Sequence, residues 1–480
     1  MLSDIIKERI KKISKLGKLG IDPYPEKTAR DFSAEEALNN FSAWSHSKKI
    51  IILAGRIRAI REHGGVIFAD LQDASAKIQI VFKKDLLKED KIKFLIEFLD
   101  LGDFLEIKGF LFETERGEKS LMGQEFKILA KSIRPLPSSW YGLEDTEERF
   151  RRRYLDLLEN KEVKQRFVLR SKIISSIRNW LKQEGYLEVE TPILQTVYGG
   201  AMACPFDTHL NTLKLKLYLR IAPELYLKRL LIGGFEKIYE IGKCFRNEGV
   251  DREHNPEFTM LELYSAYKTR DDLMTLIKDL FQAIAKEFQK DLPNANLLLK
   301  KEWAVISLEK FLEEKTKLNF QSSLKEWEKK AKDLDIALSP HSSKWKIIDA
   351  VFKKYRPEIH DPTFIIDHPV ELSPLAKRKS DNQEETARFQ LVINGWELVN
   401  AFSELNDPLD QKERLEEQAA LRKKGDLEAH PLDTDFIEAL EYGMPPAAGL
   451  GVGIDRLIAV LTDAPSLKEV ILFPFMKPRK

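Results

Sequence analysis

Between residues 50 and 130 the chain consists of short segments in which apolar residues alternate with polar ones. A period of two is typical of β-strands with one buried face, and short strands of this kind favour a small β-barrel. One segment interrupts the series because its apolar residues follow helical spacing. The predicted strands are residues 50–57, 66–72, 77–82, 104–112 and 120–130, and the predicted helix is 85–99.

Five strands with a helix between the third and the fourth is the order of a Greek-key barrel of the oligonucleotide-binding type (OB-fold). Such barrels often bind single-stranded nucleic acid on their open face. Other small β-barrels share this order, so the order alone does not fix the ligand. We therefore expect an oligonucleotide-binding barrel at residues 50–135.

Composition excludes several other classes of protein. The chain has 480 residues, 43% apolar and 32% charged, which is long enough for more than one domain. It has no run of about 18 apolar residues and no secretory segment near its start, which predicts a cytoplasmic protein with no membrane partner. Lys and Arg number 78 against 77 for Asp and Glu, so nucleic acid would have to bind through local basic surfaces. Cys204 and Cys244 are too few for a disulfide framework or a four-ligand zinc site.

Helical and proline-rich segments divide the chain. Residues 1–20 predict a basic amphipathic helix, which either packs on the body of the protein or contacts a phosphate backbone. The segment Arg134-Pro-Leu-Pro-Ser-Ser139 cannot continue a helix and predicts a boundary. The charge cluster at 147–153 is either a solvated face or a crossing point for a polyanion. The predicted parts are an N-terminal helical extension at 1–49, the barrel at 50–135, a linker or hinge at 136–165, and a second domain at 166–480 with a helical insertion at about 290–360.

Two strands predicted at 238–247 and 258–267 carry charges on faces that a sheet would normally bury. Because side chains alternate along a strand, Arg246 and Glu248 share a face of the first. One face of the second strand carries Phe258, Met260, Glu262 and Tyr264. Buried charges need partners, so this pair of strands is either a salt-bridged edge hairpin or part of a binding site.

A glycine-rich strand is predicted near the C-terminus. Residues 449–456 read Gly-Leu-Gly-Val-Gly-Ile-Asp-Arg and predict a strand that runs into a helix. Glycines let a flat ligand approach a strand, and Arg456 in the first helical turn could reach a phosphate. The spacing is neither that of a Walker loop nor that of a dinucleotide-binding fold.

Another predicted strand carries Asn400, Phe402 and Glu404 on one face. Glu397 lies an odd number of residues from Asn400, so in a regular strand its side chain would point to the opposite face. If Glu397 also points into the same site, a bulge near Leu398 is required.

Together these segments resemble the three motifs of the class II aminoacyl-tRNA synthetases, and specifically those of the bacterial-type, lysine-specific members of subgroup IIb. The run at 222–230, Ala-Pro-Glu-Leu-Tyr-Leu-Lys-Arg-Leu, is highly specific, and the similarity extends from about Ile50 to the end of the chain. The other segments that carry it are Val197-Tyr-Gly-Gly200-Ala, Phe245-Arg246-Asn-Glu248-Gly, His254-Asn-Pro-Glu-Phe258-Thr, Phe402-Ser-Glu404-Leu-Asn-Asp and the Gly449 to Arg456 run.

The resemblance implies an α+β fold, with the N-terminal oligonucleotide-binding barrel followed by an antiparallel sheet flanked by helices. It implies a homodimer formed through the helix and strand around 167–192. It further implies that L-lysine and ATP give lysyl-adenylate and pyrophosphate, and that lysine then passes to the 3′ end of tRNA(Lys). Such a reaction needs no nucleophilic side chain, because alignment of the carboxylate with the α-phosphate and neutralisation of phosphate charge supply the rate.

For the nucleotide, the resemblance implies that Arg246 and Arg456 are the catalytic residues. Arg246 would bridge the lysine carboxylate and the α-phosphate. Arg456 would hold the γ-phosphate and stack on adenine opposite Phe258, tasks that suit a planar guanidinium. Glu248 and His254 would complete the ATP site, although His254 could instead be a loop histidine bonded to backbone.

The resemblance also implies that Glu397 holds Mg²⁺, the cofactor that accompanies ATP, because this ion favours carboxylate and phosphate oxygens. The second carboxylate expected seven residues earlier is Gln390 in this chain, which offers only a neutral carbonyl oxygen. We therefore expect a weaker or a water-bridged metal site.

Substrate choice follows from charge. Lysine carries two ammonium groups that must lose water on binding, and buried carboxylates compensate for that loss. By resemblance, Glu224 with Gly200 would hold the α-amino group, and Glu262 with Glu404 the ε-ammonium group. The full set of expected lysine-binding residues is Gly200, Glu224, Glu262, Tyr264, Asn400, Phe402 and Glu404.

In the barrel, Phe68, Gln79 and Glu125 occupy the positions where the family reads the anticodon. An aromatic ring can stack on an unstacked base, and polar groups can bind its edges. Phe68 could instead be a core residue of its strand.

Two rival functions remain to be weighed. A related class II synthetase for aspartate or asparagine would be expected to carry arginine or lysine where Glu262 and Glu404 stand. A catalytically idle paralogue that binds RNA would be expected to have lost Arg246, Arg456 or Glu397, and all three are present. A class I synthetase is excluded because its two signature motifs, HIGH and KMSKS, do not occur.

Overall fold

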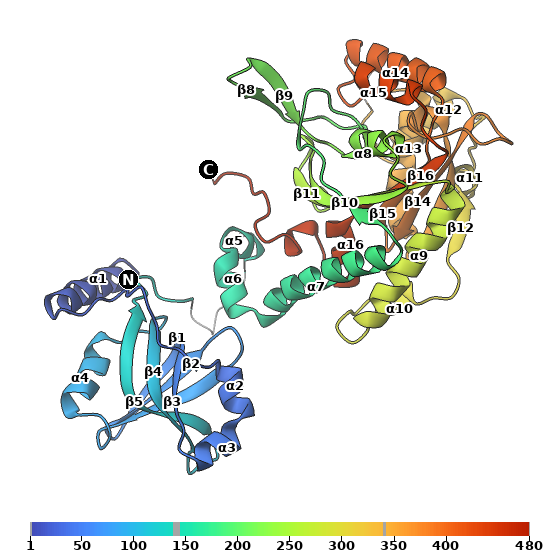
Figure 1. Ribbon diagram of the computed structural model, residues 1–480. Coiled ribbons are helices and arrows are strands. Elements are labelled where there is room, and N and C mark those ends of the chain that lie inside the picture. Colours follow the sequence, from blue (N-terminus) through green and yellow to red (C-terminus); the bar gives the residue numbers. More distant parts are fainter. Residues whose placement is uncertain (1, 138–144, 339–341, 480) are drawn as a thin grey trace. The chain divides into compact units, whose positions relative to one another are not determined.

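The computed structural model describes residues 2–137, 145–338 and 342–479, and the chain divides into two compact units at 1–143 and 144–480 (Figure 1). Each unit has its own hydrophobic core. The predicted boundary segment, 134–139, lies just before the division between residues 143 and 144. Its last two residues, Ser138 and Ser139, lie outside the described residues. The same is true of parts of the predicted linker and of the predicted insertion.

The first unit is a closed barrel with strand order β1-β2-β3-β5-β4, in agreement with the small five-stranded barrel predicted from the sequence. Alternate residues such as Ile51, Ile80 and Ile107 fill its interior, because successive side chains of a strand point to opposite faces. The elements are α1 (Leu2–Lys18), α2 (Ala34–Asn39), α3 (Phe41–His46), β1 (Ile50–His63), β2 (Val66–Gln72), β3 (Lys77–Lys83), α4 (Glu89–Phe98), β4 (Phe104–Glu113) and β5 (Lys119–Ala130).

Helix α1 confirms the predicted basic amphipathic helix, and it packs on the barrel. Leu16 belongs to the barrel core. The Nζ atoms of Lys12 and Lys15 each lie 2.8 Å from a carboxylate oxygen, of Asp100 and of Glu97 respectively. The helix is therefore anchored to its own domain through its apolar face and through part of its lysines.

The second unit is built on an eight-stranded sheet with order β12-β13-β14-β15-β16-β11-β10-β6, beside a small sheet of order β7-β9-β8. Neighbouring strands of the large sheet run antiparallel, except for the outermost pairs, β12 with β13 and β6 with β10, which are parallel. No helix in the described ranges is both long and apolar enough to cross a membrane. The strands are β6 (Leu187–Glu188), β7 (Leu194–Gln195), β8 (Asp207–Leu210), β9 (Leu215–Leu219), β10 (Lys237–Phe245), β11 (Glu257–Ala266), β12 (Ala304–Ser307), β13 (Thr363–Pro369), β14 (Glu385–Ile393), β15 (Trp396–Ser403) and β16 (Ala447–Gly453).

Helices flank this sheet, as the fold class predicts. The insertion forms a core around the buried Trp327 that also includes Ile365 of β13 and Val392 of β14. The α-helices are α5 (Thr146–Arg151), α6 (Arg153–Glu159), α7 (Lys161–Gln183), α8 (Glu224–Ile232), α9 (Arg270–Glu287), α10 (Ala295–Leu298), α11 (Leu308–Thr316), α12 (Leu324–Asp333), α13 (Lys344–Tyr355), α14 (Pro408–Lys423), α15 (Thr434–Glu441) and α16 (Ile454–Leu461).

The large sheet has one apolar and one polar face. Leu263 of β11, Ala401 of β15 and Leu450 of β16 belong to the core that the sheet forms with α7, α9 and α16 (Figure 1). The residues between them, such as Glu262 and Asn400, point to the other side. The contact with three helices on one face therefore fixes where the polar side chains of the opposite face must lie.

Two predicted boundaries were wrong. The strand predicted at 238–247 ends at Phe245, so Arg246 and Glu248 do not share a strand face. Pro256 explains the end: Arg246 donates its backbone N–H to the Pro256 carbonyl at 2.9 Å, but proline has no N–H to return. The second strand begins at Glu257 and ends at Ala266, one residue earlier than predicted at each end.

The charge cluster at 147–153 combines exposed side chains, such as Glu147 and Arg152, with buried ion pairs. Arg153 is fully buried, and its Nη1 lies 2.6 Å from Asp156 and 3.9 Å from Glu469. Arg149 pairs with Asp156 and Glu469 as well. These ion pairs join α5 and α6 to the C-terminal segment within the second unit.

Candidate active site

Three buried carboxylates lie at the centre of the candidate site. Glu224 is the first residue of α8, Glu262 lies in β11, and Glu404 directly follows β15. Their exposed fractions are 5%, 3% and 1%. The negative charge of Glu224 raises the pKa of both other groups, which places the three carboxylates in one cluster.

Lys228, which the sequence analysis did not single out, lies between two of these carboxylates. Its side chain is fully buried, and its Nζ lies 2.6 Å from Glu224 Oε1 and 2.5 Å from Glu404 Oε2. Glu262 has no ion pair among the described residues, and its Oε2 accepts a hydrogen bond of 3.1 Å from the Tyr264 hydroxyl. The cluster thus contains three acidic groups and one directly paired cation.

Burial leaves the empty cluster poorly compensated. It raises the pKa of Glu404 to about 8, although Lys228 acts in the opposite direction. Burial, and after it the charge of Glu224, raises the pKa of Glu262 well above its usual range. An incoming cation would relieve this cost by favouring the ionised carboxylates.

The other predicted pocket residues lie around this cluster. The Phe402 ring centre is 5.4 Å from Lys228 Nζ. Asn400 Oδ1 accepts a hydrogen bond of 2.8 Å from Nε of the half-buried Arg388, a second cation that the sequence analysis missed. Gly200 has a φ of +88°, and a Cβ there would lie 2.8 Å from Glu224 Cβ, so only glycine fits.

The glycines of β16 make room for the pocket side chains. In the ladder, Gly449 lies between Tyr264 of β11 and Phe402 of β15. A Cβ at Gly449 would overlap the Tyr264 ring and Glu404 Oε1. The space that we expected to admit a flat ligand is therefore occupied at this position by two side chains of the protein itself.

The predicted nucleotide residues form a second, basic part of the site. Arg246 Cζ lies 5.0 Å from the centre of the Phe258 ring, within the range of a cation–π contact. Arg246 Nε is buried and has no hydrogen-bond partner among the described residues. This donor is available to a ligand oxygen.

Arg456, in the first turn of α16, connects the two ends of this basic part. Its Nη1 donates to the Glu397 carbonyl at 3.1 Å, and its Nη2 is 3.4 Å from His254 Nε2. His254 is exposed, and its Nδ1 lies 2.9 Å from Asp251 Oδ2. Glu248 is exposed, and no ion pair or hydrogen bond joins it to Arg246 or Arg456.

The bulge predicted near Leu398 is confirmed. Leu391 pairs with Val399 and Val392 pairs with Glu397, so Leu398 is the extra residue of β15. The bulge changes the parity of the strand. Glu397 and Asn400 can therefore belong to the same side of the sheet.

Glu397 is surrounded by arginines. Arg356 Nη1 lies 3.5 Å from Glu397 Oε2, and Arg356 Nη2 lies 2.6 Å from Glu253 Oε2. Burial alone would oppose ionisation of Glu397, but Arg456, Arg356 and Arg388 hold its pKa below the usual range. The carboxylate is ionised at neutral pH and can bind a cation.

Gln390 is buried beside Glu397's strand and does not supply a second charge. Its Oε1 lies 3.4 Å from His368 Nε2, and burial keeps the pKa of His368 well below its usual range. No group of three or more acidic, histidine or cysteine side chains in the described part of the chain has the arrangement of a metal site. These donors fit a magnesium ion that arrives on nucleotide phosphates and takes one protein carboxylate.

The three predicted anticodon residues lie on barrel strands. Phe68 of β2 is outside the barrel core, since its neighbours Ile67 and Ala69 face inwards, and this excludes a core role. Gln79 of β3 accepts a hydrogen bond of 3.2 Å from the Ser120 hydroxyl. Glu125 of β5 is exposed and pairs with Lys108 at 2.9 Å.

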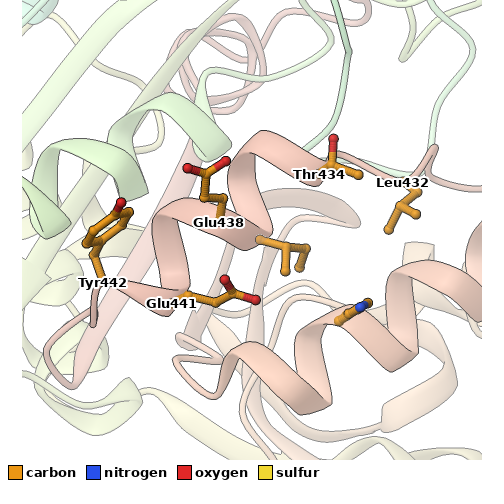
Figure 2. Close-up of a pocket in the computed structure, with 7 residues that line it drawn as sticks. Leu432, Thr434, Glu438, Glu441 and Tyr442 are labelled. Atoms are coloured by element: carbon orange, nitrogen blue, oxygen red, sulfur yellow. The ribbon is translucent and has the colours of Figure 1, made fainter.

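A surface hollow of about 600 Å³ lies beside α15 (Figure 2). Leu432, Thr434, Glu438, Glu441 and Tyr442 are among its lining residues. None of the predicted site residues lines it, so it is separate from the carboxylate cluster and from the basic part of the site.

Comparison with known proteins agrees with this geometry. The family model described as tRNA synthetases class II (D, K and N) matches residues 145–477, and the one for the OB-fold nucleic acid binding domain matches 51–136. A lysine–tRNA ligase of Carboxydothermus hydrogenoformans is 50% identical over 100% of this chain and 99% of the relative. The chain belongs to the lysine–tRNA ligase family. Further members, from Pelotomaculum thermopropionicum and Thermotoga maritima, are 47% and 42% identical and also cover the whole chain, with 96% and 97% of their own lengths matched.

Membership of the lysine–tRNA ligase family does not by itself explain Lys228, Arg356 or Arg388. One signal for Lys228 was available, since it stands four residues after Glu224 and an (i, i+4) pair meets on one helix face. Arg356 and Arg388 come from distant segments and have no comparable spacing to the residues that they contact.

We expect Gly449→Ala to destabilise the second unit by about 1–3 kcal/mol, because the added methyl group overpacks the buried space of Tyr264 and Glu404. Urea unfolding followed by tryptophan fluorescence measures the change. Gly249→Ala is the matched control, since a Cβ there meets no atom within 4 Å. Equal stability of the two variants would contradict the packing described for Gly449.

Proposed function

We propose that the chain acts as its relatives' name states, as a lysine–tRNA ligase. It activates L-lysine with ATP to lysyl-adenylate and pyrophosphate, and then transfers lysine to the 3′ end of tRNA(Lys). The observation that carries the proposal is the cluster of Glu224, Glu262 and Glu404, which is buried, acidic and adjacent to arginines. A cluster of this charge suits an amino acid with two ammonium groups.

The same cluster argues against the alternatives. An aspartate or asparagine side chain would leave Glu262 buried without a cation and Glu404 with only Lys228, which it shares with Glu224. Buried polar groups that lack partners cost several kcal/mol. An idle, RNA-binding paralogue has no need of buried carboxylates with raised pKa values, because they destabilise the empty protein. Neither alternative accounts for the free-energy cost of burying these carboxylates.

Arg246 and Arg456 are proposed to act on ATP. Arg246 would use its unpartnered Nε and the rest of its fork on the lysine carboxylate and the α-phosphate. Arg456 would hold the γ-phosphate, with His254 beside it. Because Arg246 already lies on one side of Phe258, adenine would stack on the other face of that ring.

Mg²⁺ is proposed to enter with ATP and to be held by Glu397, with Gln390 as a neutral neighbour. The ion would screen the charge of the phosphates when bound. Within the protein, Glu397 supplies the ionised oxygen, and the arginines around it keep that oxygen ionised.

The barrel is proposed to bind the anticodon of tRNA(Lys). Phe68 is available for stacking because it faces away from the barrel core, and Gln79 and Glu125 offer hydrogen-bonding groups. A homodimer is also proposed. Exposed apolar side chains in and after α7, including Val168, Leu187 and Leu194, support it. A cytoplasmic location is in keeping with this function.

The proposed reaction is tested by ATP–pyrophosphate exchange with each of the twenty amino acids. We expect exchange with lysine alone, followed by charging of tRNA(Lys). Glu262→Gln should reduce kcat/KM for lysine by at least a hundredfold, because the ε-ammonium group then loses a buried counter-charge. Exchange driven by aspartate or asparagine, or a near-normal KM for lysine in the Glu262→Gln variant, would contradict the assignment.

Lysine binding should strengthen as pH rises from 6 to 8. Burial raises the pKa of Glu404 to about 8, so this group holds a proton at lower pH and must release it when an ammonium group arrives. Affinity should therefore rise by nearly tenfold per pH unit well below 8 and level off above it. Calorimetry in buffers of different ionisation enthalpy measures the proton release, and binding at pH 7 without any release would exclude the mechanism.

Gln390→Glu should lower the magnesium concentration needed for half-maximal exchange by about threefold or more, because a second carboxylate joins Glu397. Binding of Mn²⁺ to the ATP complex, followed by electron paramagnetic resonance, gives a readout that is independent of turnover. Gln411→Glu, a change at a buried glutamine bonded to the Pro374 carbonyl, is the matched control. Unchanged metal affinity in Gln390→Glu would show that this position does not face the metal.

A further inference from the structure

Lys228 occupies an unusual position for a lysine. It lies one helical turn after Glu224 in α8, and its Nζ joins that carboxylate to Glu404, which comes from the far end of β15. Its side chain is fully buried, with the rings of Phe402 and Phe436 within 6.0 Å of Nζ. An ammonium group in such surroundings stays charged only because two carboxylates face it.

Each of the two carboxylates uses one oxygen for Lys228 and turns the other toward a glycine. Glu224 Oε2 faces Gly200, where a Cβ would lie 3.5 Å away. Glu404 Oε1 faces Gly449 and is buried without a hydrogen-bond partner among the described residues. The ion pairs with Lys228 therefore take one oxygen of each carboxylate and leave the other directed at a glycine, where no Cβ displaces it.

The charge of the cluster is set by the same residue. Three carboxylates and one ammonium group leave two negative charges when all are ionised. Free lysine brings two ammonium groups. Without Lys228 the cluster would carry three negative charges, one more than the substrate can compensate.

We propose that Lys228 is a positioning and specificity-determining residue, which fixes Glu224 and Glu404 and matches the pocket charge to the two ammonium groups of lysine. The proposal rests on the assignment of this cluster as the lysine site. Lys228 does not contact the reacting atoms, and it acts through the two glutamates that bind the substrate.

The other groups near Lys228 do not titrate between pH 6 and 9. Burial, and then the charge of Lys228, lower the pKa of His430 to about 4, so this histidine is neutral. The pKa of the Tyr264 hydroxyl is raised well above its usual value by burial and by the glutamates. Arg388 remains cationic throughout this range, because a guanidinium is protonated far above pH 9. A pH response in this range therefore reports on the carboxylate cluster.

The test replaces Lys228 by methionine, which keeps most of the volume and removes the charge. We expect the KM for lysine to rise at least tenfold with the KM for ATP within twofold of the wild type, because one of the glutamates takes up a proton in place of the lysine. The pH at which kcat/KM for lysine reaches half of its plateau should move up by at least one unit. Lys228→Arg should restore part of the affinity and most of the pH profile.

Two further variants keep the test decisive. Lys268→Met is the matched control, since Lys268 forms an exposed (i, i+4) pair with Asp272 at 3.1 Å, and it should behave like the wild type. The double variant Lys228→Met with Glu404→Gln removes one charge of each sign. It should fold even if the single variant does not, and it should lose the upward pH shift while keeping a high KM for lysine.

A Lys228→Met variant with a KM for lysine within twofold of the wild type and an unshifted pH profile would overturn the proposal. So would an upward pH shift that persists in the double variant. If the wild-type protein shows no exchange with lysine, the proposed function fails first, and the two failures are thereby distinguished.

Discussion

The burial of like charges against one face of its sheet is the constraint that shapes the candidate site of the second unit. Desolvation of Glu224, Glu262 and Glu404 disfavours their ionised forms, and the raised pKa of Glu404, about 8, is the direct sign of that cost. The sheet can hold them because its opposite face packs on three helices and supplies stability independently of the site. The pocket is thus an electrostatically costly arrangement, and under the proposed function a ligand with two ammonium groups would relieve most of that cost.

The alternation of side chains along a strand explains how much of the candidate site could be predicted from the sequence. The parity of Glu262 and Tyr264 in β11 and of Asn400 and Phe402 in β15 is a local property, so it could be read from the chain. The bulge at Leu398 could be inferred because Glu397 had the wrong parity for a shared site. Each of these inferences required only the geometry of a single strand.

The features of the fold and the site that could not be predicted depend on tertiary contacts. The end of β10 at Phe245 follows from its pairing with a strand that starts after Pro256, which no window around Arg246 reveals. The outward position of Phe68 depends on closure of the barrel, and the link from Glu224 through Lys228 to Glu404 joins residues far apart in the chain. Arg356 reaches Glu397 from the end of the insertion, for which the sequence analysis predicted only helices.

The two parts of the site carry opposite charge, and this separation bears on how the two reactants are oriented. Carboxylates gather around Lys228, whereas Arg246, Arg456 and Arg356 gather around Phe258 and Glu397. Under the proposed function, an amino acid with two ammonium groups would be attracted to the first part, so its own carboxylate, the group of opposite sign, would be turned toward the second. A triphosphate would be attracted to the arginines for the same reason. The proposed assignment of the two parts therefore accounts for the alignment of both reactants that an in-line attack on the α-phosphate requires.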